Sequence, residues 1–181
     1  MLIKGMNSMT FKNKVIYQIY PKSYLDTTGN GIGDIQGIIS KLDYLADLGI
    51  DMIWLNPIYP SPQRDNGYDI SDYTAIDPVF GTMTDFDRLI AAAKQRGIDV
   101  MLDMVLNHVS IEHEWFQKAL AGDTYYQDFF FIQDTPTDWV SKVGGNAWAP
   151  FGDTGKYYLH LFDVTQADLI WRNEHVRQSL F

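Results

Sequence analysis

Three groups of polar residues stand at spacings that could do chemistry. The first group comprises Asp103, Asn107 and His108, which interrupt the end of an apolar run that begins at Ile98. Each of them needs a partner, because an unpaired polar group in a buried strand is costly. Polar residues at the carboxyl ends of parallel strands are also where α/β sheets and barrels hold ligands. The group therefore indicates either a hydrogen-bonded cap on the strand or a ligand site, with His108 as the favoured ligand contact.

The second group is the acidic and aromatic segment Asp65–Tyr73, DNGYDISDY, which follows a predicted strand. A carboxylate such as that of Asp65 can accept two hydroxyl hydrogen bonds. A tyrosine ring such as that of Tyr68 can pack on the apolar face of a sugar. A solvated turn has the same spacing, so the segment is interpreted as either a carbohydrate-binding loop or an exposed turn.

The third group is the segment Asp26–Asp34, DTTGNGIGD, in which oxygen-bearing side chains recur at alternate positions around Gly31. This is the pattern of a calcium-binding loop, although Gly37 stands where an EF-hand would have its bidentate glutamate. A glycine-rich turn followed by a helix N-cap at Asp34 is the alternative. The segment predicts a metal site, with Ca²⁺ ahead of Mg²⁺.

Alternating strands and helices must position these groups. Apolar runs predict strands, and helical periodicity closed by Gly49 and Gly97 predicts helices. A capping box, Thr84 with Asp87, marks the start of the second helix. The β-α-β-α-β order predicts parallel strands with right-handed crossovers. The expected strands are Val15–Tyr20, Asp51–Leu55 and Ile98–His108, and the first expected helix is Ile35–Leu48.

The strand–helix alternation stops after His108. The segment Val109–Thr165 is rich in aromatic residues, glycine and proline, and it is too long for an ordinary loop between a strand and a helix. We expect a small inserted subdomain there, followed by a helix that is capped by Asn173 and carries Val176 and Leu180. The predicted division is residues 1–108, 109–165 and 166–181.

Composition narrows the class of protein. The 181 residues are 46% apolar, include 11 Tyr, 10 Phe and 5 Trp, and carry a net charge of −9. This acidic balance argues against nucleic-acid binding, which needs a basic surface. The chain has no cysteine, no apolar run that could cross a membrane and no signal-peptide core in its first ten residues. We expect a soluble, cytoplasmic protein without a membrane partner.

Together these motifs resemble the α-amylase family of glycoside hydrolases. The matching segments are DMVLNH at Asp103–His108, DNGYD at Asp65–Asp69, the Asp26–Asp34 loop and QADL at Gln166–Leu169. The resemblance implies an α/β fold, the N-terminal part of a (β/α)₈ TIM barrel, with an inserted domain B after the third strand. It also implies that the sequence holds only about the first three of eight strands.

Within that family the chain is similar to the oligo-1,6-glucosidase branch, and most of all to its trehalose-6-phosphate hydrolases. Further segments carry this likeness: YPKS from Tyr20, SKVGGNAW from Ser141 and YYLHLFDVTQADL from Tyr157. The likeness implies a substrate-binding set, a supporting set and a set of Ca²⁺ ligands. These are Asp65, Tyr68 and His108 for substrate, Asp103, Asn107 and Gln166 for support, and Asp26, Thr28, Asn30, the Ile32 carbonyl and Asp34 for the metal.

The resemblance also implies which catalytic groups lie elsewhere. Retaining glycoside hydrolysis needs a nucleophilic carboxylate and an acid/base carboxylate on opposite sides of the scissile bond. In this family they follow later strands, so we expect them beyond residue 181 and expect residues 1–181 alone to be inactive.

The implied activity of the longer enzyme is cleavage of trehalose 6-phosphate to glucose and glucose 6-phosphate. It would act as a monomer on a disaccharide or phosphodisaccharide, and Arg64 is a candidate phosphate contact beside the loop. One alternative is an oligo-1,6-glucosidase that cleaves isomaltose-type sugars. The others are a non-catalytic sugar- or calcium-binding module and a transporter-associated ectodomain, which should carry a membrane helix.

Overall fold

The computed structural model describes residues 11–180, so the first ten residues, for which no signal-peptide core is expected, lie outside that range. The chain folds into two compact units. Unit 1 contains the chain up to Asn56 together with Pro78–Asp103, and unit 2 contains Pro57–Asp77 together with the chain from Met104. These units divide the chain at other residues than the predicted domain boundaries, which stay a prediction.

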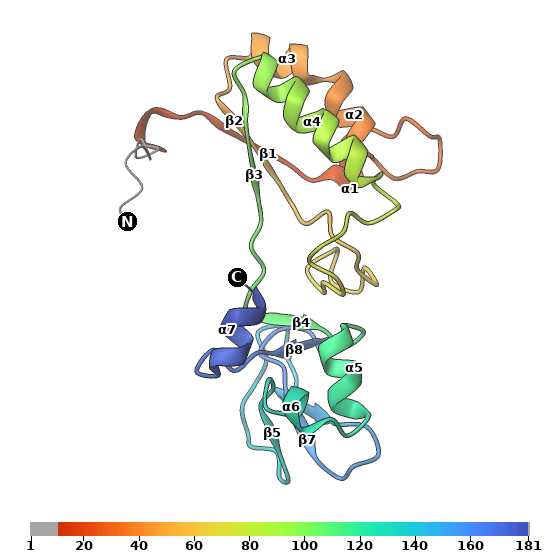
Figure 1. Ribbon diagram of the computed structural model, residues 1–181, viewed down its shortest axis with the longest axis vertical. Helices are drawn as coiled ribbons and strands as arrows, with labels where there is room; N and C mark the ends of the chain where they lie inside the picture. The colour runs from red at the N-terminus through yellow and green to blue at the C-terminus, as the bar shows by residue number, and fades with distance from the viewer. Residues whose placement is uncertain (1–10, 181) are drawn as a thin grey trace. The chain divides into compact units, whose positions relative to one another are not determined.

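Unit 1 is built around a parallel three-stranded sheet in the order β1-β2-β3 (Figure 1). Helices α2, α3 and α4 lie together beside it in the ribbon, as the predicted β-α-β-α-β order requires. The prediction of parallel strands is confirmed. The elements are the 3₁₀ turn η1 (Phe11–Asn13), β1 (Ile16–Ile19), α1 (Pro21–Tyr24), α2 (Ile35–Ser40), α3 (Leu42–Asp47), β2 (Met52–Leu55), α4 (Met83–Gln95) and β3 (Asp99–Leu102).

The helices of unit 1 differ from the prediction in two details. The helix expected over Ile35–Leu48 is interrupted at Lys41, whose backbone (φ −105°, ψ 1°) leaves the helical region, so that α2 and α3 are separate. The capping box of α4 is formed by Thr82 and Asp85. The prediction of Thr84 and Asp87 was therefore wrong by two residues. The extended backbone of Thr82 lets its hydroxyl accept the Asp85 amide.

The strand expected over Ile98–His108 is also shorter than predicted. Strand β3 ends at Leu102, where its neighbour β2 ends at Leu55, and the next residues have no regular structure. The β2–β3 ladder cannot continue far, because Pro57, two residues after the end of β2, has no amide hydrogen to donate. His108 instead begins a separate strand, β4 (His108–Ser110), which pairs antiparallel with β8 (Gln166–Asp168) in unit 2.

Unit 2 has an aromatic core. Phe116 makes edge-to-face contacts with Phe130, Phe151 and Tyr158, with ring centroids 5.2, 5.5 and 4.9 Å away. The predicted cap of the last helix is confirmed, since the Asn173 side chain accepts the His175 amide at 2.9 Å. Besides β4 and β8, the unit contains α5 (Glu114–Leu120), α6 (Thr124–Gln127), β5 (Ile132–Gln133), β6 (Trp148–Pro150), β7 (Tyr157–Leu159) and α7 (Glu174–Leu180) (Figure 1).

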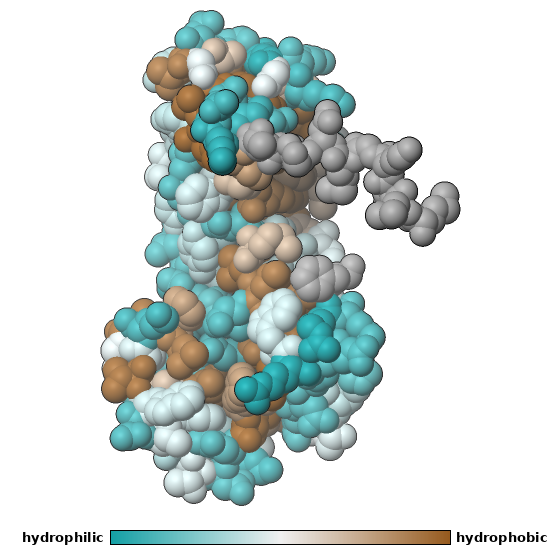
Figure 2. Space-filling model, turned by 90° about the vertical axis from the view of Figure 1, so that its left-hand side faces the viewer, coloured by the Kyte–Doolittle hydropathy of each residue, from teal (hydrophilic) through white to brown (hydrophobic). Residues whose placement is uncertain are grey.

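Apolar side chains also reach the surface of both units, beside hydrophilic ones (Figure 2). In unit 1, Val15 and Ile16 at the start of the sheet are 55% and 40% exposed, and all four residues of β3 are only partly buried. A strand in the interior of a complete barrel is covered on both faces.

Within residues 11–180, no helix is long and apolar enough to cross a membrane.

Candidate functional site

Asp69 organises the loop that contains the DNGYD segment. Its side chain is fully buried and accepts hydrogen bonds from the Ser61 hydroxyl (2.8 Å) and from the amides of Arg64 (2.9 Å) and Asp65 (3.1 Å). These three donors satisfy a carboxylate that would otherwise be very costly to bury. The loop is therefore an ordered turn rather than a solvated one. Asp69 was part of the predicted segment, but its anchoring role was missed.

The turn presents Asp65 to a residue 101 positions away. The Gln166 amide nitrogen donates to the Asp65 carboxylate at 2.8 Å. Gln166 is fully buried at the start of β8, and its amide oxygen accepts the Asp163 backbone amide at 2.9 Å. The Gln166 side chain is thereby held at both ends, and its nitrogen can only point toward Asp65. Two of the predicted site residues are brought together in this way.

His108 lies in the same unit and contacts the same turn. Its ring is 4% exposed and packs against Phe162, with centroids 5.2 Å apart. Nε2 lies 3.2 Å from the Tyr68 carbonyl oxygen, and Nδ1 lies 3.2 Å from the Asn107 amide nitrogen. A carbonyl oxygen can only accept and an amide nitrogen can only donate, so the proton is on Nε2 and Nδ1 is bare.

Burial favours this neutral form of His108. It lowers the pKa of the ring, against the opposing effects of the Tyr68 carbonyl and of the carboxylates Asp65 and Asp69. The turn and β4 therefore combine a carboxylate acceptor, a neutral imidazole donor and the half-buried Tyr68. Such a mixture can bind the hydroxyl groups and the apolar face of a sugar.

Asp103 is the one predicted supporting residue that falls in unit 1. Its carboxylate accepts the indole Nε1–H of Trp54 at 2.9 Å. This contact between the ends of β2 and β3 agrees with a strand cap, which was one of the two interpretations of the group. Asn107 and His108 belong to unit 2.

Asp168 is a buried acidic residue that sequence reasoning did not include among the site residues. It is 3% exposed, it stands opposite His108 in the β4–β8 ladder, and its carboxylate accepts the Leu161 amide at 3.2 Å. Burial raises its pKa to about 6, although the Leu161 amide, the Asn107 side chain and His160 favour the charged form. The QADL segment was the signal available, but only its glutamine was assigned a role.

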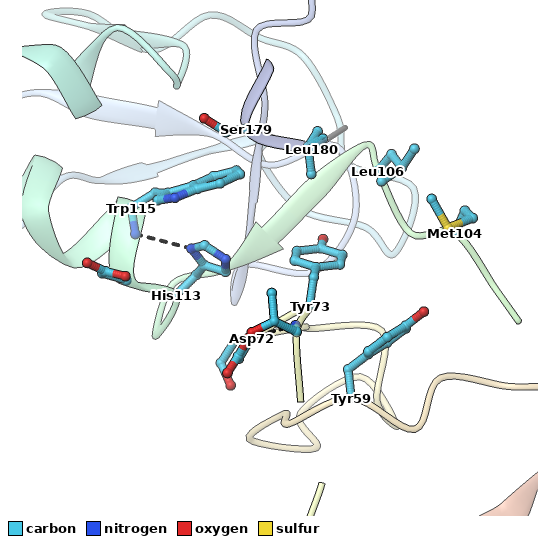
Figure 3. A pocket seen from close by; sticks show the side chains of 12 residues that line it. Tyr59, Asp72, Tyr73, Met104, Leu106, His113, Trp115, Ser179 and Leu180 are labelled. Carbon is cyan, nitrogen blue, oxygen red and sulfur yellow. Dashed lines mark hydrogen bonds between the residues drawn. The ribbon is translucent and has the colours of Figure 1, made fainter. Parts of the chain in front are cut away.

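A separate pocket of about 530 Å³ lies in unit 2 (Figure 3). Its labelled side chains include Tyr59, Tyr73 and Trp115, and His113 accepts the Trp115 amide at 3.1 Å. None of Asp65, Tyr68 and His108 lines it. Its link with the residues above is through the backbone, since the Tyr73 hydroxyl lies 2.6 Å from the carbonyl oxygen of Val105 and 2.9 Å from that of His108.

The predicted metal loop is stabilised by its own hydrogen bonds. Asp26 accepts the amides of Thr28, Gly29 and Gly31 at 2.7–2.8 Å, which lowers the pKa of its carboxyl, the Gly31 amide having the largest effect. Asn30 accepts the Ile32 amide at 2.8 Å.

Asp34 is the N-cap of α2, where it accepts the Gly37 amide at 2.7 Å, and it also accepts the Thr27 hydroxyl. Within residues 11–180, no group of three or more acidic, histidine or cysteine side chains is placed to hold a metal ion. The donor types nevertheless fit a hard cation, because all of them are oxygen atoms and a carboxylate oxygen can accept more than one contact. Among Asp26, Thr28, Asn30, Ile32 and Asp34, two side chains are carboxylates.

Comparison with known proteins agrees with this fold and with the sequence motifs. The family model described as alpha amylase, catalytic domain, matches residues 18–181. The trehalose-6-phosphate hydrolase of Bacillus subtilis (strain 168) is 54% identical over 178 residues, and the match covers 94% of this chain and 32% of that protein. The oligo-1,6-glucosidase of Heyndrickxia coagulans is 51% identical over 178 residues, with the same shares covered.

Solved structures of full enzymes superpose closely on the chain. The crystal structure of Bacillus licheniformis trehalose-6-phosphate hydrolase matches with a TM-score of 0.90 and 56% identity, over 93% of this chain and 32% of that one. The trehalulose synthase of Pseudomonas mesoacidophila MX-45 matches with a TM-score of 0.90 and 50% identity, over 92% and 31%. The chain thus spans about a third of the length of its relatives. It belongs to the α-amylase family and corresponds to the N-terminal third of full-length (β/α)₈ barrel proteins of that family.

Proposed function

We propose that these residues form the N-terminal part of a retaining α-glucosidase-type glycoside hydrolase. The observation that carries the proposal is that Gln166 and His108 both contact the turn that holds Asp65: Gln166 donates to the Asp65 carboxylate, and the His108 ring lies 3.2 Å from the Tyr68 carbonyl oxygen. In this proposal Asp65 accepts sugar hydroxyls, and the Tyr68 ring packs on the sugar. His108 exchanges its contact with the Tyr68 carbonyl for a hydroxyl near the scissile bond, to which it donates its Nε2–H. Asn107, Gln166 and Asp103 support them.

The proposed substrate is trehalose 6-phosphate, which would yield glucose and glucose 6-phosphate. Two relatives at 54% identity, from Bacillus subtilis and Escherichia coli, are trehalose-6-phosphate hydrolases, and this is the support for the assignment. An isomaltose-type sugar is the second candidate, because oligo-1,6-glucosidases are 51% identical or less. Arg64, which is exposed beside the site, is the candidate phosphate contact.

Residues 1–181 do not run the reaction by themselves in this proposal. The nucleophile and the acid/base carboxylate come from later strands of the barrel, and without a nucleophile no glycosyl-enzyme intermediate can form. Glucose release from trehalose 6-phosphate, trehalose and isomaltose by the full-length gene product tests the substrate. Release from trehalose 6-phosphate should dominate, and preferential cleavage of isomaltose would establish the alternative. The polypeptide of residues 1–181, assayed beside it, should release no glucose from any of the three.

We also propose that the Asp26–Asp34 loop binds Ca²⁺ through Asp26, Thr28, Asn30, the Ile32 carbonyl and Asp34. Support comes from the oxygen-only donor set and from the position of Asp34, which joins the loop to the start of α2. The ion would neutralise the two carboxylates and hold the loop against the helix. We propose a cytoplasmic location and a monomeric full-length enzyme.

A further inference from the structure

A buried carboxylate that the proposed mechanism does not use stands next to the candidate sugar-binding histidine. Asp168 and His108 are directly opposed in the β4–β8 ladder, and the Leu169 amide bonds to the Asn107 carbonyl at 2.9 Å. One oxygen of the Asp168 carboxylate accepts the Leu161 amide at 3.2 Å. The Asn107 side chain interacts with the same carboxylate. Asn107 therefore lies between Asp168 and the ring of His108.

The donors and acceptors of Asp168, Asn107 and His108 are compatible with one arrangement of hydrogen bonds. A carboxylate can only accept, so Asp168 selects the amide nitrogen of Asn107 and not its oxygen. The same nitrogen, with its second hydrogen, lies 3.2 Å from Nδ1 of His108 and keeps that nitrogen bare. The remaining ring proton is then on Nε2, which faces the Tyr68 carbonyl at 3.2 Å.

We propose that Asp168 is a positioning residue: through the Asn107 amide, it holds His108 as a neutral imidazole whose Nε2–H points to the Tyr68 carbonyl oxygen in the candidate sugar-binding turn, where a sugar hydroxyl would replace that acceptor. This inference rests on the proposed function and extends it. The other charged or titratable groups that act on this pair are Asp65 and Asp69 near His108, and His160 near Asp168. The carboxylates Asp65 and Asp69 favour the positively charged ring of His108, and the Asn107 contact with Nδ1 opposes that second protonation.

The neutral form matters because of the transition state. Glycoside hydrolysis passes through an oxocarbenium-like state with positive charge on the sugar ring. An imidazolium beside that ring would repel the developing charge, whereas a neutral imidazole can donate a hydrogen bond without repulsion. Loss of the Asp168 contact should therefore lower kcat more than it changes KM.

Asp168→Asn in the full-length enzyme tests the proposal. The substituted amide has one oxygen, which the Leu161 amide requires, so its NH₂ group would face Asn107. Asn107 would then turn its oxygen to that position and present an acceptor to Nδ1 of His108. With acceptors at both ring nitrogens, His108 should bind a second proton more readily, and its pKa should rise. If Asp168 acted on His108 only through its negative charge, the loss of that charge would lower the pKa of His108. The direction of the pKa change therefore distinguishes the effect through Asn107 from a purely electrostatic effect.

The measurement is a pH titration of the ring carbon signals in [¹³Cε1]-histidine-labelled enzyme, with the His108 signal assigned by its loss in His108→Gln. We expect a raised His108 pKa in Asp168→Asn and a loss of kcat of roughly tenfold at neutral pH, recovering at higher pH. Asp123→Asn removes an exposed carboxylate that caps α6 in the same unit and should change neither quantity. Asn107→Ala, which removes the donor to Nδ1, should raise the pKa of His108 as well and replaces Asp168→Asn if that variant does not fold.

The outcomes separate this inference from the proposed function. A His108 pKa that stays constant or falls in the variants overturns the positioning role, whatever the activity. A raised pKa in an enzyme whose wild type hydrolyses no α-glucoside supports the positioning of His108 and refutes the glycosidase assignment.

Discussion

Replacement of Gln166 by glutamate probes the contact that joins the two parts of the candidate site. Gln166→Glu keeps the shape of the side chain and the oxygen that accepts the Asp163 amide, but it replaces the nitrogen that lies 2.8 Å from the Asp65 carboxylate. A donor–acceptor contact becomes a contact between two carboxyl groups. Gln166 is fully buried, so water can relieve little of the repulsion.

The loss of stability caused by Gln166→Glu has an upper limit. Two unit charges about 3 Å apart repel each other by roughly 5 kcal/mol at an effective dielectric constant of about 20. The pair can escape this repulsion by binding one proton, which at about pH 7 costs roughly 4 kcal/mol for a carboxyl with an ordinary pKa near 4.3. We therefore expect a loss of about 2–4 kcal/mol in the free energy of unfolding at neutral pH.

The sign of the pH dependence follows from proton binding. The folded variant binds a proton at this pair that the unfolded chain does not bind, so its stability falls as pH rises, by up to about 1.4 kcal/mol per pH unit. Relative to wild type, both stability and kcat/KM on an aryl α-glucoside should recover between about pH 7 and pH 5, because the protonated carboxyl can again donate to Asp65.

Gln178→Glu is the matched control. Gln178 makes the same kind of contact, its amide nitrogen donating to the Glu174 carboxylate at 3.0 Å, but on the exposed face of α7. Like charges there should cost only a few tenths of a kcal/mol, or about 0.5 kcal/mol at most. Thermal unfolding and kinetics of both full-length variants at several pH values are the assay. A Gln166→Glu defect that is independent of pH, or no larger than that of Gln178→Glu, would refute the reasoning.

Three other predictions concern the scaffold. Gly37→Ala should cost about 2–3 kcal/mol, because the new Cβ would overlap the carbonyl oxygen of Leu25, whereas Gly49→Ala, at φ +79° with open space around it, should cost about 1 kcal/mol; equal losses in urea unfolding would contradict this. His113, whose pKa burial lowers to about 4, should reduce stability by up to about 3 kcal/mol as pH falls from 6.5 to 4, because the unfolded chain binds the proton first; the pH-independent cap in His113→Asn should remove that dependence. Chelation of Ca²⁺ should lower the Tm of the full-length protein but not that of Asp26→Ala, and an equal decrease in both would exclude the loop as the site.

Local sequence patterns determined the elements of this protein well. Apolar runs and helical periodicity predicted three parallel strands and the helices between them, since both signals reflect which face of an element must be buried. The long motifs also carried the family, which the match over residues 18–181 confirms. The loop Asp65–Asp69 and His108 were named from the sequence because their residue types suit a ligand site, whereas Gln166 was named only through the resemblance to the family.

Tertiary structure decided how these residues act together. Strand β3 ends at Leu102 because its partner strand ends, and a pattern within residues 98–108 holds no information about that partner. The contact of Gln166 with Asp65 spans 101 positions, and the burial of Asp168 opposite His108 depends on the pairing of two strands from distant segments. Local sequence states which groups are present, whereas the charge and tautomer of each group depend on burial and on donors and acceptors that only the folded chain brings near.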